Sequence, residues 1–140
     1  MPHLRHVQLF RIRYSDIDQM GTYYNARALE WFEWGRTELC RTLGKSYRQW
    51  EEEGVRLPVM TAHVDYQGRA QYDDELRMTT TARMDGRAKM RFDVEIVQLE
   101  TAAPVCRGHT IHAITDRSGR PIRPPKWLLA LMETSDDPTP

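Results

Sequence analysis

A long helical pattern over residues 25–43 constrains the fold more than any other feature, because it is apolar on more than one side. Apolar residues recur along it at steps of three and four, which places them on one helical face; they are Ala28, Phe32, Gly35, Leu39 and Leu43. Four more widen that face, namely Leu29, Trp31, Trp34 and Cys40. A helix this apolar needs cover on more than one side, so the rest of the chain is expected to surround it.

The other patterned segments alternate with a period of two, as a β-strand with one buried face does. Two such runs flank Gly86, where the chain is expected to turn, and together they predict a β-hairpin. Segments rich in β-branched and aromatic side chains favour further strands. The predicted strands are 6–14, 59–66, 76–85, 90–96 and 105–115, and short helices are predicted at 47–53 and 124–133.

One broadly apolar helix and about five strands combine most simply when an antiparallel sheet wraps around the helix. This is the hotdog architecture, an α+β fold with a five-stranded antiparallel sheet around one long central helix. A helix lying in an open curved sheet, as in cystatin-like folds, uses the same elements, and periodicity alone does not decide between the two. The strand before the helix favours the hotdog fold. Because one helix leaves part of the sheet uncovered, we expect a homodimer or homotetramer.

The size and charge of the chain narrow its class. Its 140 residues fit a single domain, which we place at 1–134, followed by a flexible polar tail at 135–140. Lys plus Arg equals Asp plus Glu at 20 each, so binding to nucleic acid or to an acidic membrane surface is not expected. No apolar run is long enough to span a bilayer. Cys40 and Cys106 lie far apart and fit reduced thiols in the cytoplasm.

The segment between the first strand and the long helix has the clearest potential for chemistry. Asp16 and Asp18 lie there, two residues apart, just before Gly21. A carboxylate beside a helix N-terminus lies near free N–H groups and the positive end of the helix dipole, which can polarise a carbonyl. These groups suffice for acyl transfer. The alternative is that both acids only form a turn or cap the helix, which these residues alone favour. Asn25 is either the N-cap or a ligand contact.

Other catalytic patterns lack support. The five histidines form no HxH or HExxH pattern, and there is no Gly-x-Ser-x-Gly elbow and no Walker or Rossmann glycine motif. Glu33 adjoins the apolar helix face and would need a partner if partly buried; Arg36 could supply it. Basic residues cluster near the hairpin and near the end of the chain, where they could hold a phosphate-rich ligand.

The stretch YSDIDQMGTYYN at 14–25, followed by FEWGRTE at 32–38, resembles the 4-hydroxybenzoyl-CoA thioesterase-like family of hotdog proteins. Members of that family carry a Y-x-D-x-D-x-x-G-x-x-Y stretch and then F-E-x-x-R. The segments 72–76 and 119–121 also resemble the family, so the likeness covers nearly the whole chain. It implies an acyl-CoA thioesterase that uses neither a metal nor a redox cofactor.

The resemblance also implies roles for particular residues. The second aspartate of the pair, here Asp18, would act as nucleophile or general base on the thioester. Backbone N–H groups near Tyr24 and Asn25 would polarise its carbonyl, and the loop at Gly21 would contact the substrate. Coenzyme A would lie along a subunit interface, and the hairpin residues Arg87 and Lys89 are the candidates for its phosphates, by position rather than by motif.

The sequence also departs from the family. Many relatives have His where Asn25 stands, and asparagine cannot act as an acid or base near neutral pH. Three functions stay open: acyl-CoA hydrolysis, a non-catalytic module that binds acyl-CoA or acyl-carrier protein, and hydrolysis of an aromatic acyl-CoA.

Overall fold

The structure is a computed structural model that describes residues 4–133. It contains one five-stranded sheet in the order β1-β3-β4-β5-β2, and all four strand pairs are antiparallel. This confirms the predicted α+β class and the antiparallel five-stranded sheet. The strands β1 and β2 form the two edges. The strands are β1 (Leu4–Arg11), β2 (Val59–Tyr66), β3 (Glu75–Met84), β4 (Lys89–Gln98) and β5 (Pro104–Ala113).

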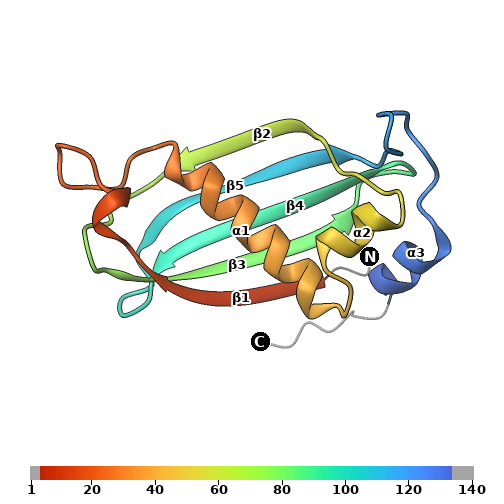
Figure 1. Ribbon diagram of the computed structural model, residues 1–140. Coiled ribbons are helices and arrows are strands. Elements are labelled where there is room, and N and C mark those ends of the chain that lie inside the picture. The colour runs from red at the N-terminus through yellow and green to blue at the C-terminus, as the bar shows by residue number, and fades with distance from the viewer. Residues whose placement is uncertain (1–3, 134–140) are drawn as a thin grey trace.

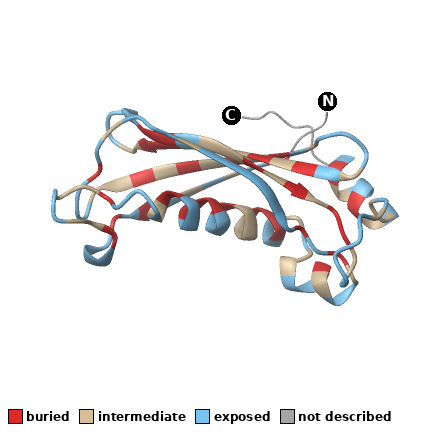
Figure 2. Cartoon of the chain, turned by 90° about the horizontal axis from the view of Figure 1, so that it is seen from above, coloured by how far each residue is buried: buried red, intermediate tan, exposed pale blue. Residues whose placement is uncertain are grey.

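The long helix α1, Arg27–Thr42, lies against one face of the sheet (Figure 1). The sheet curves around it, and the buried residues of α1 face the strands (Figure 2). The predicted cover on several sides is only partly right, because Leu29 and Trp34 remain 42% and 43% exposed. The reason is that the sheet of a single chain covers one side of the helix and leaves the other to solvent (Figure 2).

Two glycines allow α1 to approach the sheet closely. A Cβ atom on Gly35 would clash with the side-chain oxygen of Thr80 on β3. A Cβ atom on Gly108 of β5 would lie 2.9 Å from Cε2 of Phe32 and would also clash with the carbonyl oxygen of His63. Glycine at both positions therefore brings the backbone of α1 within packing distance of the strands.

The core follows the predicted alternation. Along β3, the buried residues are Leu76, Met78, Thr80 and Ala82, and their neighbours are half-buried or exposed. One cluster of buried residues lies under the first half of α1. A second lies under its C-terminal half, where two short helices cover it, α2 (Tyr47–Glu52) and α3 (Lys126–Glu133). Both short helices were predicted from the sequence.

Several element ends differ from the prediction. The first strand stops at Arg11, and a short 3₁₀ turn, η1 (Tyr14–Asp16), follows it. The helix begins at Arg27 rather than at Asn25, and Asn25 is not the N-cap, which is Ala26 without a side-chain cap. The predicted tail at 135–140 lies outside the described residues. Within residues 4–133, no helix is long and apolar enough to cross a membrane.

Candidate active site

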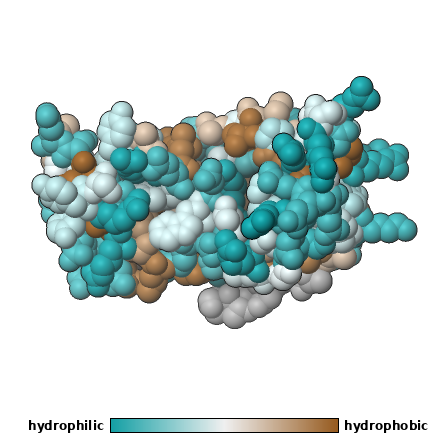
Figure 3. Space-filling view, in the orientation of Figure 1, coloured by the Kyte–Doolittle hydropathy of each residue, from teal (hydrophilic) through white to brown (hydrophobic). Residues whose placement is uncertain are grey.

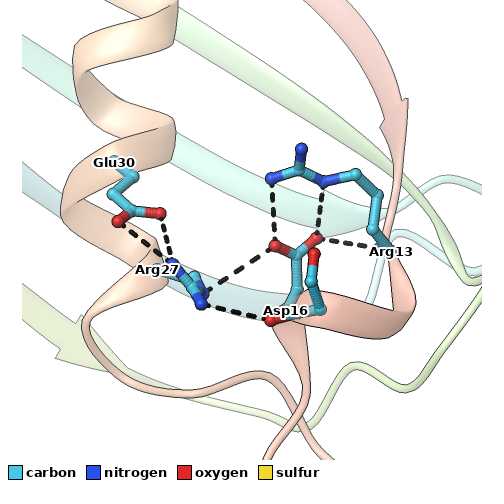
Figure 4. Close-up of polar contacts among 5 residues, drawn as sticks. Arg13, Asp16, Arg27 and Glu30 are labelled. Carbon is cyan, nitrogen blue, oxygen red and sulfur yellow. Dashed lines mark hydrogen bonds and ion pairs between the residues drawn. The ribbon is translucent and has the colours of Figure 1, made fainter.

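The two acids that precede α1 occupy different environments. Asp16 is only 1% exposed, whereas Asp18 is half-buried. The Asp16 carboxylate accepts hydrogen bonds from Arg13, at 2.8 Å from the backbone N–H, 3.3 Å from Nε and 3.2 Å from Nη2 (Figure 4). The carboxylate in turn raises the pKa of Arg13, mainly through the side-chain hydrogen bond. Asp16 thus holds the η1 turn together.

Arg27, in the first turn of α1, ties this turn to the helix. Its Nε lies 3.9 Å from Oδ1 of Asp16, and its Nη2 donates to the carbonyl oxygen of Ser15 at 3.2 Å. Its Nη1 donates to both carboxylate oxygens of Glu30, at 2.9 and 3.1 Å (Figure 4). The contacts of Asp16 are therefore those of a group that positions the loop, which agrees with the turn-forming alternative for this residue.

Asp18, two residues after Asp16, opens a tight turn. Its Oδ1 accepts from the N–H of Met20 at 2.8 Å, and its N–H donates to the carbonyl oxygen of Thr22 at 2.9 Å. Gly21 completes the turn with a φ of 80°, which few residues other than glycine adopt. Among residues 4–133, no group donates to Oδ2 of Asp18. One carboxylate oxygen is thus held in place and the other is open to a substrate or water.

The N–H groups before α1 are only partly available. The N–H of Tyr24 donates to the carbonyl oxygen of Asp16 at 2.8 Å, so it is not the free donor that the resemblance implied. The N–H groups of Asn25 and Ala26 donate to no acceptor in the described part of the chain. The Asn25 side chain is exposed and does not cap the helix, because carbonyl groups of Tyr24 and Asn25 themselves accept from Arg27 and Ala28.

Two further residues support this loop, and sequence reasoning missed both. Arg69 donates from Nη2 to the carbonyl oxygen of Met20 at 2.8 Å, and the Tyr66 hydroxyl donates to the carbonyl oxygen of Asn25 at 3.0 Å. Tyr66 is the last residue of β2, and Arg69 lies three residues after it. The sheet brings this end of β2 beside the start of α1. No sequence motif marks them, because their position depends on the pairing of β2 with β5.

The structure separates Arg87 and Lys89 from Asp18 within one chain. Both are exposed residues at the β3–β4 turn, whereas the Asp18 loop follows the opposite end of β1, where Arg11 pairs with Glu75 (Figure 1). The length of β3 separates these ends by roughly 30 Å, at about 3.3 Å per residue. A substrate that contacts both within one chain would have to span this length.

The predicted pair of Glu33 and Arg36 lies elsewhere on α1. Both line a cavity of about 440 Å³ beside the helix. Glu33 is exposed, and no carboxylate among residues 4–133 lies within 4.0 Å of Arg36. Across the same residues, no group of three or more His, Cys, Asp or Glu side chains is placed to hold a metal ion.

These features define a class. A curved antiparallel sheet around one helix, with a carboxylate turn before that helix, is the hotdog fold of thioesterases. The chain belongs to the Thioesterase-like superfamily, whose family model matches residues 12–132. The solved structure of Slr0204, a 1,4-dihydroxy-2-naphthoyl-CoA thioesterase from Synechocystis, has the same fold, with a TM-score of 0.84, 19% sequence identity and coverage of 97% of this chain and 99% of that one.

Two curated relatives share a shorter stretch of sequence. The "Putative acyl-CoA thioesterase YneP" of Bacillus subtilis is 40% identical over 63 residues, which are 45% of this chain and 46% of YneP. The acyl-CoA thioesterase YbgC of Haemophilus influenzae is 39% identical over 71 residues, 50% of this chain and 52% of YbgC. The chain thus spans about half the length of the curated relatives it matches.

Proposed function

We propose that this chain hydrolyses the thioester bond of an acyl-CoA with Asp18 as the reacting carboxylate. The observation that carries the proposal is the state of Asp18, whose Oδ1 is fixed by the N–H of Met20 while Oδ2 has no protein donor among residues 4–133. Membership of the Thioesterase-like superfamily supports it, as do the names of the relatives YneP and YbgC.

The free N–H groups of Asn25 and Ala26 suit the thioester carbonyl oxygen. Negative charge develops on that oxygen when the carbonyl carbon is attacked, and N–H donors at the positive end of a helix stabilise it. Asp18 then has two available roles. As nucleophile, its oxygen bonds to the carbonyl carbon, the C–S bond breaks, coenzyme A leaves as a thiolate, and water hydrolyses the resulting anhydride. As general base, it takes a proton from the attacking water.

An assay of the purified protein against short, long and aromatic acyl-CoAs tests this function, with released thiol as the readout. Hydrolysis of at least one thioester is the expected result. The engaged N–H of Tyr24 favours the second candidate, a non-catalytic module that binds acyl-CoA or acyl-carrier protein. Binding of acyl-CoA in calorimetry without release of thiol from any member of the panel would favour that module. A cytoplasmic location, which two free buried cysteines support, stays a prediction.

We propose that two copies pair through β2. This edge strand is exposed along nearly its whole length, and Val59 and Met60 are 51% and 61% exposed. Hydrophobic side chains also lie along the edge of the molecule where β2 runs (Figure 3). Such an edge favours pairing with another chain. Sedimentation velocity at micromolar concentration should give a dimer or a dimer of dimers, and a monomer would contradict both the pairing and a shared site.

An antiparallel pairing of the two β2 strands would also bring Arg87 and Lys89 of one copy toward the Asp18 loop of the other. Val59 lies at the hairpin end of the sheet, where His112 pairs with both Val59 and Met90, and Tyr66 lies at the Asp18 end, where it contacts Asn25. Reversal of the second β2 therefore places the hairpin end of one copy beside the Asp18 loop of the other.

Substitution of Arg87 or Lys89 by Ala is expected to raise KM for acyl-CoA about three- to tenfold while kcat changes less. Contacts to coenzyme A phosphates are remote from the thioester, so the ground state and the transition state should lose them equally. Steady-state kinetics on both variants measures this, with Arg77→Ala as a control on the sheet face away from α1. If KM stays unchanged in both, the phosphates bind elsewhere, and Arg120 and Arg123 become the candidates.

A further inference from the structure

The cavity beside α1 is built differently from the Asp18 loop. It lies against the middle and C-terminal half of the helix, between α2 and the start of β2, and has a volume of about 440 Å³. One part of its wall is apolar, formed by Leu57, Val59 and Phe92, and the other carries the polar side chains of Arg36, His112 and Glu33. An elongated ligand with an apolar body and one polar end fits such a wall.

Arg36 lines this cavity, and among residues 4–133 its one side-chain hydrogen bond is long. Its Nη1 lies 3.5 Å from Oγ1 of Thr110, a long hydrogen bond, and no carboxylate among residues 4–133 lies within 4.0 Å of it. A guanidinium has five N–H donors and no acceptor, so most of the donors of Arg36 have no acceptor in the described chain. Burial lowers the pKa of Arg36, and the nearby charge of Glu33 raises it.

A series of buried hydrogen bonds holds the Arg36 guanidinium in place. Thr110 and His112 of β5 are each only 2% exposed. The Nδ1 of His112 lies 2.9 Å from the carbonyl oxygen of Leu57, which can only accept, so Nδ1 carries the hydrogen. Burial lowers the pKa of His112 to about 4, so the ring is neutral at pH 7 and Nε2 accepts from the Thr110 hydroxyl at 2.8 Å.

The direction of these hydrogen bonds leaves N–H donors of Arg36 available to an anion. Donation runs from Arg36 to Thr110, from Thr110 to His112, and from His112 to the carbonyl of Leu57. Burial of polar groups costs free energy unless they form hydrogen bonds with one another. Here Thr110 and His112 are paired, and the donors that stay unmet belong to Arg36, which lines the cavity.

We propose that this cavity receives the far end of the acyl group and that Arg36 selects acyl chains that end in a carboxylate. The proposal rests on the proposed acyl-CoA hydrolysis. A guanidinium matches a carboxylate with two parallel hydrogen bonds, and the apolar wall suits the methylene chain. In the β2 pairing, the Asp18 loop of the second copy lies at the Val59 end of the strand, so an acyl chain that starts there enters the cavity beside Val59.

The test compares matched substrates. Coenzyme A monothioesters of dicarboxylic acids with four to eight carbons are assayed beside straight-chain acyl-CoAs of equal carbon number. The measured quantity is the ratio of kcat/KM for the carboxylate-ended substrate to kcat/KM for the neutral one, in which any loss of folded protein cancels. The wild-type ratio should exceed one at one or more chain lengths, and Arg36→Gln should lower it about 10- to 100-fold, the effect of a charged hydrogen bond.

Two other variants sharpen the result. Glu33→Gln removes from the cavity wall a negative charge that repels the substrate carboxylate. It should therefore raise the ratio about two- to fivefold. Arg41→Gln removes an arginine of the same helix that is 59% exposed and paired with Glu38, and it should leave the ratio unchanged. An equal loss of ratio in Arg41→Gln and Arg36→Gln, or a wild-type ratio below one at every length, would overturn the proposal.

A titration with free adipate separates this inference from the proposed function, because it needs no turnover. Wild-type protein should bind adipate in calorimetry, and Arg36→Gln should not. If no acyl-CoA is hydrolysed but adipate binds through Arg36, the proposed hydrolysis fails and the carboxylate site stands. If adipate does not bind, or if free coenzyme A displaces it, the cavity is not a site for an acyl carboxylate.

Discussion

Replacement of Asp18 by Asn is expected to lower kcat for acyl-CoA hydrolysis by about two to four orders of magnitude, the usual loss when a positioned acid–base group is removed. Asparagine keeps the size of the side chain and can still accept from the N–H of Met20. It cannot attack the thioester or take a proton from water. Substrate binding should largely survive, because the amide fits and a negative charge has gone.

Kinetics with thermal melts as a folding control measure this effect. Asp18 is half-buried and its side chain accepts one hydrogen bond, from Met20, so the melting temperature of Asp18→Asn should stay close to that of the wild type. Asp16→Asn is the matched comparison, since it makes the same chemical change two residues away. Equal losses of turnover in the two variants that track their losses of stability would sink the catalytic assignment of Asp18.

The fold could be predicted from the sequence because buried residues recur with the period of each helix or strand. The alternation along β3 and the three- and four-residue steps of α1 are direct records of which side chains face the core. At the start of α1, one of the two alternatives for Asn25 was wrong, because Ala26 rather than Asn25 is the N-cap. Carbonyl groups, rather than a side chain, accept the N–H groups of Arg27 and Ala28 there, and no residue pattern reports such a turn.

The site was less accessible, because its contacts join distant segments. The motif located both acids, but it could not tell that Asp16 would be buried between Arg13 and Arg27 while Asp18 stayed open. For the cavity at Arg36, the sequence contains one informative pattern. Thr110 and His112 lie two residues apart, hence on the same face of a strand, and two polar residues on a core-facing side indicate a buried network. That network could be recognised only once β5 was packed against α1.

Asp16→Asn is expected to lower the free energy of unfolding by about 2–4 kcal/mol, a loss within the range for breaking a buried charged network. The substitution leaves the N–H and guanidinium donors of Arg13 with a single acceptor oxygen, and its amide donors would face other donors. It also removes the anion that lies 3.9 Å from the buried Nε of Arg27, an atom that has no hydrogen-bond partner in the described chain. Urea unfolding measures the loss, at one fixed protein concentration because assembly adds to apparent stability.

Glu30→Gln is the control for this effect, because Glu30 pairs with the same Arg27 but its side chain is 59% exposed. An exposed ion pair contributes about 0–1 kcal/mol, so the control should stay near wild-type stability. Well below its melting temperature, Asp16→Asn should retain most of its turnover, because Asp16 contacts the loop and not the open face of Asp18. If Asp16→Asn instead unfolds like the wild type and loses turnover as Asp18→Asn does, the chemistry belongs to Asp16, and Asp18 is the residue that only forms the turn.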